Sequence, residues 1–258
     1  VAFSEAKKAA LAHGLEVYRP VSLRYPQEVE KLTRLCPDVI VVAAFGQILS
    51  PDILAVPPFG CVNVHPSLLP RHRGPSPVAS VILAGDEVTG ATIMLMDREV
   101  DTGPILSQRE VAVFAQDTTG SLEDRLAVVG SRLLIETLPL WLEGKLTPQS
   151  QDKEGVSYSK LIVKEEGEID WNLSAVYLWR CVRAFQPWPG CYTWWEGRRL
   201  KIIEAVPLSE GKGVEVGQVV ALKEPQAVAG VGCGEGILGI RQVQLEGKRS
   251  MSAEEFVR

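Results

Sequence analysis

The sequence feature that most restricts the fold is a continuous apolar run at residues 38–44, where no polar side chain follows Asp38. Such a run predicts a strand buried on both faces, as in a parallel sheet that helices cover on two sides. An amphipathic stretch at residues 26–35 comes just before it and predicts a helix. Helix and strand patterns therefore alternate here, which indicates an α/β sheet.

The alternation continues through the first half of the chain. Ser4 can cap a helix that stops at Gly14, and residues 15–18 then have the pattern of a short strand. Strands are expected at residues 61–65, 91–96 and 105–113, and helices from Pro77 and over residues 121–142. We predict that residues 1–145 form a Rossmann-like, doubly wound and mostly parallel sheet. Because such sheets normally begin with a strand, we also expect a further segment before Val1.

The residue composition and the pattern of expected elements change after the long helix. Residues 146–164 are polar and are predicted to be an interdomain linker. In residues 165–258 a helix at 174–185 is followed by strand-like runs at 191–195, 199–205, 217–222 and 236–246. Short strands between Gly and Pro turns predict a small C-terminal β-barrel. The glycine-rich stretch 230–236 lacks a following Lys-Ser/Thr pair, so we interpret it as a hairpin turn and not as a phosphate loop.

Composition excludes some classes of function. No apolar run in the 258 residues approaches the roughly 18 residues that cross a bilayer, so no membrane role is expected. The five cysteines are scattered and form no C-x-x-C motif, which favours reduced thiols and no metal site. The net charge is −5, yet residues 175–258 hold 11 Lys and Arg against 9 Asp and Glu. This asymmetry is compatible with a C-terminal part that faces nucleic acid, although a charge difference this small more often reflects ordinary solvated surfaces.

Asn63 and His65 are the first candidates for chemistry. They lie two positions apart at the end of a predicted strand, so their side chains share one face of the sheet. Polar groups at the carboxyl ends of strands in an open α/β sheet point into the ligand crevice. There an imidazole can exchange protons and an amide can donate to a developing oxyanion, which suits acyl transfer. A structural pair, satisfied within a strand-to-loop turn, explains the same two residues equally well.

Two nearby loops hold further candidates. Residues 66–74 contain two prolines, a terminal glycine, and the cations Arg71 and Arg73, as in a stiff ligand wall or a solvated loop. In the loop at residues 96–103, Asp101 is placed to orient a histidine or to relay protons. On its own, this second loop is also an ordinary acidic turn.

These motifs together resemble the folate-dependent formyltransferases. The resemblance rests on Asn63-Val-His-Pro-Ser-Leu-Leu-Pro70, on Arg73-Gly74 and on Asp101-Thr-Gly103. It implies a catalytic triad of Asn63, His65 and Asp101. Segments 41–49, 82–90, 168–171, 182–190 and 245–252 are similar, more narrowly, to the methionyl-tRNA formyltransferase family. In that family the first strand and an arginine-bearing loop that wedges into the tRNA would precede Val1.

The resemblance implies a formyltransferase fold with a C-terminal OB-like barrel, and formyl transfer from N10-formyltetrahydrofolate to methionyl initiator tRNA without a metal. It implies a monomer that supports translation initiation in the bacterial cytosol. The folate would contact Phe45, Gln47, Ile48, Leu49, Ser67, Leu68, Leu69 and Pro70. The tRNA would contact Arg71, Arg73, Arg198, Arg199, Lys201, Lys248 and Arg249. Three questions stay open. His65 can act first as a base or as an oxyanion donor, and the acceptor can instead be a sugar nucleotide or glycinamide ribonucleotide. The chain can also be a non-catalytic fragment that binds folate or tRNA.

Overall fold

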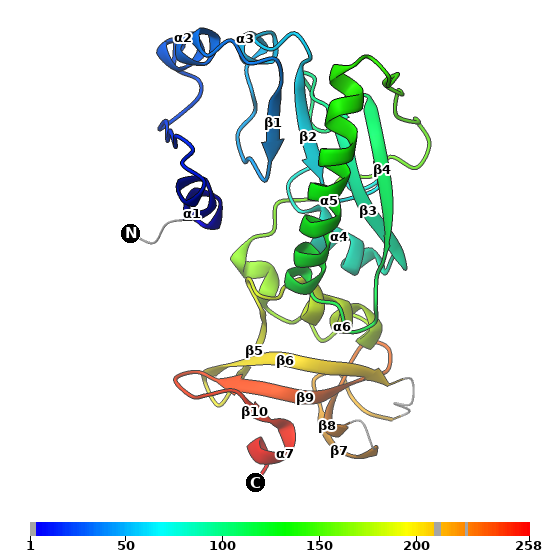
Figure 1. Cartoon of the computed structure of the whole chain (residues 1–258). Helices are drawn as coiled ribbons and strands as arrows, with labels where there is room; N and C mark the ends of the chain where they lie inside the picture. The colour runs from blue at the N-terminus through cyan, green and yellow to red at the C-terminus, as the bar shows by residue number, and fades with distance from the viewer. Residues whose placement is uncertain (1–3, 209–212, 225–226) are drawn as a thin grey trace.

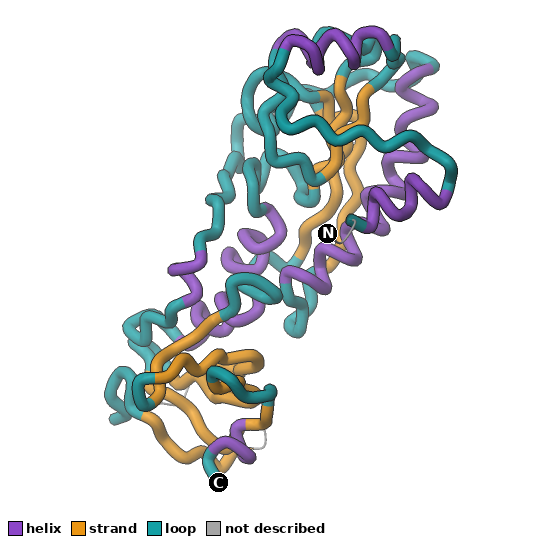
Figure 2. The backbone as a smooth tube through the Cα atoms, turned by 90° about the vertical axis from the view of Figure 1, so that its left-hand side faces the viewer, coloured by secondary structure: helices purple, strands orange, loops and turns teal. Residues whose placement is uncertain are grey.

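The computed structural model describes residues 4–208, 213–224 and 227–258. Figures 1 and 2 show an elongated molecule with one sheet near each end and helices between them. The N-terminal part contains α1 (Glu5–Ala12), α2 (Pro26–Arg34), β1 (Ile40–Ala43), α3 (Pro51–Leu54), β2 (Cys61–His65), α4 (Pro77–Ala84), β3 (Val88–Leu95), β4 (Ile105–Ala112) and α5 (Thr119–Leu142). The C-terminal part contains η1 (Lys164–Gly167), α6 (Ala175–Ala184), β5 (Cys191–Trp195), β6 (Arg198–Leu208), β7 (Val219–Glu224), β8 (Ala227–Gly232), β9 (Ile237–Leu245), β10 (Met251–Ser252) and α7 (Ala253–Phe256).

The N-terminal sheet is mixed, with the strand order β1-β2-β3-β4. β1 and β2 are parallel, whereas β2 pairs with β3, and β3 with β4, in antiparallel fashion. The prediction of a mostly parallel sheet is therefore wrong for the residues described. β3 is buried along most of its length although it is antiparallel, because α5 covers one of its faces and residues 67–69 contact it from the loop after β2. A continuous apolar run indicates that both faces of a strand are buried, but it does not indicate whether the strand is parallel or antiparallel to its neighbours.

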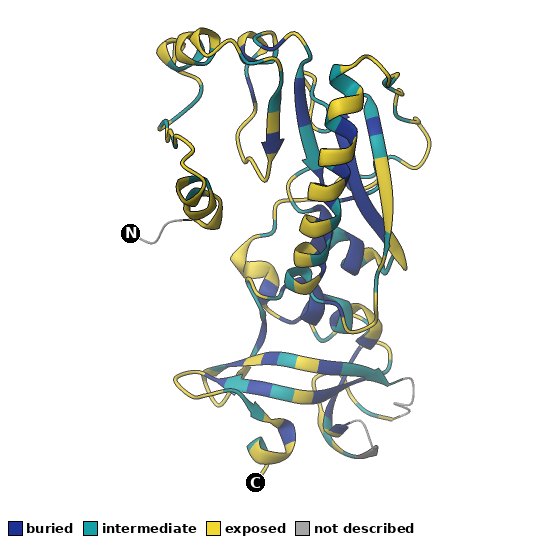
Figure 3. Ribbon diagram, viewed as in Figure 1, coloured by how far each residue is buried: buried dark blue, intermediate teal, exposed yellow. Residues whose placement is uncertain are grey.

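The helix α5 holds the N-terminal part together. Thr118 accepts a hydrogen bond from the backbone of Ser121, and Ser121 bonds back to Thr118, which forms a capping box at the first turn. Its buried residues are Leu122, Leu126, Gly130, Leu133 and Thr137, a helical stripe that faces the sheet. Figure 3 shows the opposite face of α5 largely exposed. The first helix is less anchored, since α1 buries no residue, and the predicted strand at residues 15–18 does not form.

The C-terminal sheet is antiparallel throughout, in the order β5-β6-β9-β8-β7, and β10 pairs with β9. Within the part of the chain that the structure describes, β5 and β7 stay unpaired with each other, so the closed barrel expected from the sequence is not seen. Repeated Gly and Pro turns predict short antiparallel strands correctly, but they do not specify whether the first and last strands meet.

One hydrophobic core crosses the boundary between the two parts. Val81 and Ile82 of α4 and Leu126 of α5 belong to the same buried cluster as Val182 of α6 and Leu238 of β9. The α6 helix therefore packs against α4 on one side and against the C-terminal sheet on the other. None of the described helices is both long and apolar enough to cross a membrane.

Candidate active site

The parallel pair β1 and β2 brings two candidate segments to one edge of the sheet. Val42 pairs with Asn63 in this ladder, so the residues after β1 lie beside the carboxyl end of β2. In Figure 1 both arrows point toward the end of the sheet that faces the C-terminal part. Asn63, His65 and the segment that begins at Phe45 thereby lie at one edge of the sheet.

His65 is buried and held by two different neighbours. The residue is 4% exposed, and Nε2 of its ring lies 3.1 Å from the carbonyl oxygen of His72. Because a carbonyl only accepts, Nε2 carries a proton in this contact, which leaves Nδ1 as the nitrogen that can gain or lose one. Nδ1 lies 3.6 Å from Oδ2 of Asp101. Burial lowers the pKa of His65, and the charge of Asp101 opposes that effect.

Asp101 has an unusual backbone conformation. Its φ is 55°, in the left-handed region that non-glycine residues seldom adopt. The backbone N–H of Gly74 donates to Oδ2 over 2.8 Å, so the carboxylate is fixed between the loop after β2 and the His65 ring. The structure therefore brings His65 and Asp101 together although they are far apart in sequence.

Asn63 is the third residue of the predicted triad. It is half-buried in β2, paired with Met94 of β3, and its position two residues before His65 puts both side chains on one face. Among the residues described, its side-chain amide has no hydrogen-bond partner. The amide thus keeps its donor capacity for a ligand at the strand end.

The residues expected to contact folate fall into two groups. Phe45 and Ile48 are 42% and 65% exposed at the end of β1, where an apolar ligand can reach them. Leu49 lies instead in a hydrophobic cluster with Ile53, and Gln47 accepts a hydrogen bond from the backbone of Leu23.

The loop after β2 faces inward more than the sequence suggests. Ser67 is fully buried, its hydroxyl donates to the carbonyl of Arg71, and its own carbonyl accepts from Thr92. The backbone of Leu69 is bound to Thr92 and Gln108, while Leu68 and Pro70 are half-buried. The backbone of Ser67 and Leu69 therefore holds the loop on the sheet, and the buried side chains of both residues do not line an open surface.

The two arginines of this loop are already engaged. Arg71 donates two hydrogen bonds to Asp86, which also contacts the buried ring of His72. Arg73 is 8% exposed and donates from Nε and Nη2 to Oε1 of Gln151. The structure does not present Arg73 as a surface cation.

The C-terminal cations predicted to contact tRNA do gather in one place. Leu200 pairs with Leu245, which brings the β5–β6 turn beside the turn after β9. The cations around these turns are Arg198, Arg199, Lys201, Lys248 and Arg249. Arg199 stacks over Tyr192 and Trp194, and Arg249 forms an ion pair with Glu255. Lys201 and Lys248 are exposed.

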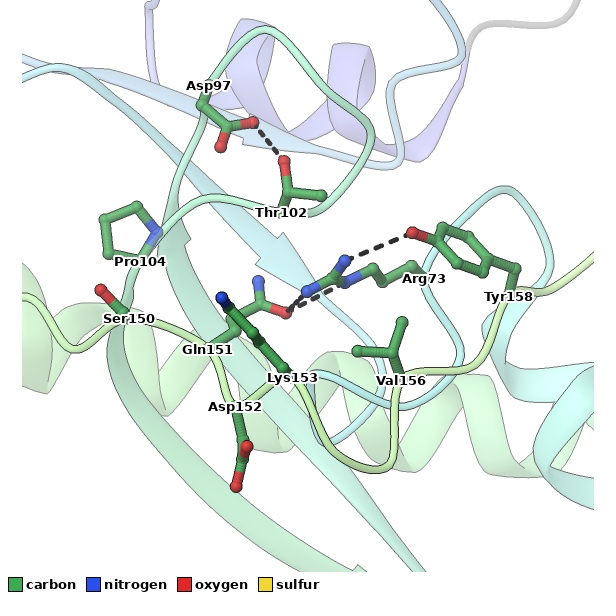
Figure 4. Close-up of a pocket in the computed structure, with 10 residues that line it drawn as sticks. All are labelled: Arg73, Asp97, Thr102, Pro104, Ser150, Gln151, Asp152, Lys153, Val156 and Tyr158. Atoms are coloured by element: carbon green, nitrogen blue, oxygen red, sulfur yellow. Dashed lines mark hydrogen bonds between the residues drawn. The ribbon is translucent and has the colours of Figure 1, made fainter.

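The polar stretch predicted to be a linker also contributes to the site, which the sequence does not reveal. Gln151 bonds to Arg73 and to the backbone around Asp101, and Ser157 and Ser159 bond to the loop that holds His72. Figure 4 shows Arg73 between Gln151 and Tyr158 in a surface pocket of about 500 Å³. No local pattern marks these residues, because their partners lie roughly 50 to 90 positions away.

The described residues do not favour metal-dependent chemistry or a nucleophilic cysteine. No group of three His, Cys, Asp or Glu side chains there could hold a metal ion. Burial raises the pKa of both Cys61 and Cys181 to about 11, so these thiols stay protonated near neutral pH and are poor nucleophiles.

Known proteins with similar sequences match over nearly the whole chain. Residues 2–138 match the family described as formyl transferase, and residues 161–258 match the formyl transferase C-terminal domain. A methionyl-tRNA formyltransferase of Methylococcus capsulatus is 45% identical over 257 residues, which is 100% of this chain and 82% of that protein. One of Roseiflexus sp. is 46% identical over 253 residues, 98% of this chain and 77% of that protein.

Solved structures share the fold at lower identity. HypX from Aquifex aeolicus in complex with tetrahydrofolic acid superposes with a TM-score of 0.64 at 19% identity, over 90% of this chain and 41% of HypX. WlaRD, a sugar 3N-formyl transferase solved in the presence of dTDP and 5-N-formyl-THF, gives 0.68 at 18% identity, over 94% and 82%. The sequence matches, together with this fold, show that the chain belongs to the methionyl-tRNA formyltransferase family.

Proposed function

We propose that this protein transfers a formyl group from N10-formyltetrahydrofolate to the α-amino group of methionyl initiator tRNA. The observation that carries the proposal is the buried His65 ring facing Asp101, with Asn63 on the same strand face, in a chain of this family. The monomeric state and the bacterial cytosol that the sequence implies are part of the same proposal.

The three polar residues have distinct roles in the proposed transfer. The folate supplies the activated formyl group. The amide of Asn63 donates a hydrogen bond to the formyl oxygen as negative charge develops there. His65 acts through Nδ1, because its Nε2 is committed to the carbonyl of His72. Asp101 stabilises the protonated ring, since its carboxylate lies 3.6 Å from Nδ1.

The attacking amine needs little help to reach its reactive form. A free α-amino group has a pKa of about 7.7 to 8.0, so a substantial fraction is unprotonated near neutral pH. The barrier lies mainly in the tetrahedral oxyanion, which is the charge that the amide of Asn63 is placed to stabilise. The proton released by the amine then needs an acceptor, and His65 beside Asp101 can take it and pass it to N10 of the folate, which leaves as tetrahydrofolate when its bond to the formyl carbon breaks.

The folate is proposed to lie at the carboxyl end of β1. Phe45 and Ile48 leave apolar surface exposed next to β2, which suits the flat ring of a pterin. Structures that share this fold were solved with tetrahydrofolic acid and with 5-N-formyl-THF, which supports a folate site in the same fold.

The tRNA is proposed to contact the C-terminal cations. In this proposal residues 1–145 are the catalytic domain, 146–164 the linker, and 165–258 an OB-like tRNA-binding domain. Lys201, Lys248 and Arg198 are exposed and can follow a phosphate backbone, which gives affinity without sequence specificity.

The choice of acceptor tests this proposal. The protein is incubated with N10-formyltetrahydrofolate and, in separate reactions, methionyl initiator tRNA, glycinamide ribonucleotide and an amino-sugar nucleotide. We expect formyl transfer to the tRNA at a rate at least about tenfold above that to either small acceptor. Preferential transfer to a small acceptor would reject the tRNA as substrate and retain only the reaction class.

A further inference from the structure

Residues 149–159 are fastened to both loops of the candidate active site. Gln149 exchanges two backbone hydrogen bonds with Ile105, at 2.7 and 2.8 Å, beside the loop that holds Asp101. Further along, the backbone of Arg73 donates to the carbonyl of Ser157 and accepts from the N–H of Ser159. This segment is therefore part of the structure that carries His65 and Asp101.

Gln151 is the side chain of this segment that reaches the Asp101 loop. Its Nε2 donates to the carbonyl of Asp101 and to that of Gly103, each over 2.8 Å. Its Oε1 accepts from Nε and Nη2 of Arg73 at 3.1 and 2.7 Å. A primary amide has two donors at one end and an acceptor at the other, so this arrangement uses both ends. Figure 4 shows the amide of Gln151 facing the guanidinium of Arg73.

The backbone that Gln151 holds is a strained one. Asp101 has a φ of 55°, a backbone conformation that is unfavourable for a non-glycine residue unless the surrounding structure compensates. The Gly74 N–H fixes the carboxylate of Asp101, and Gln151 fixes its carbonyl. If the carbonyl were released, the Asp101 backbone could relax toward negative φ, which would swing the carboxylate away from His65.

We propose that Gln151 is a positioning residue for the transfer reaction: it holds Asp101 in the left-handed conformation that keeps the carboxylate 3.6 Å from Nδ1 of His65. This proposal rests on the proposed function for its kinetic consequence, but its structural consequence can be measured without any substrate. Gln151 touches no reacting atom, so its effect passes through Asp101.

The kinetic test compares Gln151→Met with Gln149→Met. Both variants make the same change in the same segment, but Gln149 is exposed and contributes only its backbone to the contact with Ile105. We expect kcat to fall by about 10- to 100-fold in Gln151→Met, because misplacing a catalytic group by about 1 Å can produce a loss of this size. The KM values for folate and tRNA should stay within about twofold of wild type. Gln149→Met should match wild type, and both should melt within a few degrees of it.

A second variant separates the contact with Arg73 from the contact with Asp101. In Gln151→Glu the carboxylate can still accept from Arg73, but it cannot donate to the carbonyls of Asp101 and Gly103. We expect kcat to fall in Gln151→Glu at least as much as in Gln151→Met. Wild-type kcat in Gln151→Glu would mean that anchoring Arg73 is the whole role of Gln151, and would overturn the proposal.

The structural test follows the titration of His65 by NMR, which is practical because the chain has three histidines. The ionisable groups that face His65 are Asp101, which raises its pKa, and His72, which lowers it. Moving Asp101 away should lower the pKa of His65 further in Gln151→Met and leave it unchanged in Gln149→Met. The limb of the kcat/KM profile that belongs to His65 should move to lower pH in parallel.

The outcomes separate the two proposals. An unchanged titration of His65 in a folded Gln151→Met rejects the positioning role, whatever the enzyme does. A wild-type protein that shows no transfer to tRNA, but whose His65 pKa falls in Gln151→Met, rejects the proposed function and keeps the positioning role.

Discussion

At the scale of single residues, the candidate site is defined by how His65 is surrounded. The ring is nearly inaccessible, one nitrogen is held by a backbone carbonyl, and the other faces a carboxylate that belongs to a distant loop. Burial lowers the pKa of His65 and the charge of Asp101 opposes that effect, so the position of Asp101 influences how readily His65 takes up a proton.

Removing the charge of Asp101 tests that relationship. Asp101→Asn keeps the shape of the side chain but removes the negative charge that stabilises protonated His65. We expect kcat for formyl transfer to fall by about 100-fold or more, and a similar loss in Asn63→Ala, which removes the proposed oxyanion donor. Asp124→Asn on the exposed face of α5 is the matched control and should keep wild-type kcat. Wild-type turnover in Asp101→Asn would exclude its assigned role.

The pH dependence of stability tests the burial of His65. Its pKa in the folded protein is lowered, so the unfolded chain binds the proton more tightly. This group's contribution to the free energy of unfolding is therefore full above about pH 6.5, the ordinary histidine value, and is lost as pH falls from there toward the lowered pKa.

Denaturant unfolding at pH 7.5 and pH 5 checks this dependence. His65→Gln removes the titrating ring, so we expect its stability to fall less between the two pH values than that of the wild type. His13→Gln, at an exposed position, should fall as much as the wild type. Equal losses in all three proteins would contradict the lowered pKa.

The sequence predicts the centre of this site better than its surroundings. The two-residue spacing of Asn63 and His65 predicts a shared strand face, and the structure has that arrangement. It cannot predict that Gln151 bonds to the backbone around Asp101, because that contact depends on how two distant loops meet. For the same reason it does not predict that Ser67 and Leu69 face the sheet.

At the scale of elements, α5 can lie close to the sheet because of Gly130. A Cβ at this position would lie 2.9 Å from Cγ1 of Val64 and 3.5 Å from the Cβ of Ala91. We expect Gly130→Val to lower the free energy of unfolding by about 1 to 3 kcal/mol through overpacking. Ser131→Val places the same β-branched side chain at an exposed position of the helix and should cost well under 1 kcal/mol. Equal costs in the two variants would place the effect in helix propensity and not in the contact with β2.

The kinds of element are predicted more reliably from sequence than their pairing. The apolar run at 38–44 contains β1, and the alternating run at 61–65 coincides with β2. The pairing of β2 and β3 depends on which way the chain returns after α4, which periodicity does not encode. Residues 15–18 show a strand pattern without forming a strand, because a short apolar stretch needs a neighbouring strand to pair with.

At the scale of the whole molecule, the two parts are joined by packing as well as by chain. The core that includes α4 and α6 is apolar and continuous, and residues 149–159 lie against the active-site loops. A polar composition predicted a linker there. It did not reveal that this stretch has fixed hydrogen-bond partners.

The basic end of the C-terminal sheet leads to a prediction about tRNA affinity. We expect Lys201→Ala and Lys248→Ala together to raise the KM for methionyl initiator tRNA several-fold and to leave the KM for folate unchanged. If each lysine contacts one phosphate, the slope of log K against log salt should decrease by about one for each. Lys145→Ala, at an exposed position after α5, is the control and should change neither quantity. A salt dependence equal to that of the wild type would exclude these lysines from the tRNA contact.

The central claim is that His65 carries out formyl transfer to methionyl initiator tRNA. It is tested most directly by measuring the transfer of labelled formyl from N10-formyltetrahydrofolate to that tRNA with wild type and with His65→Ala, after both are shown to be folded. We predict transfer by the wild type and a loss of about 100-fold or more in the variant. Transfer at comparable rates by both proteins would contradict the claim.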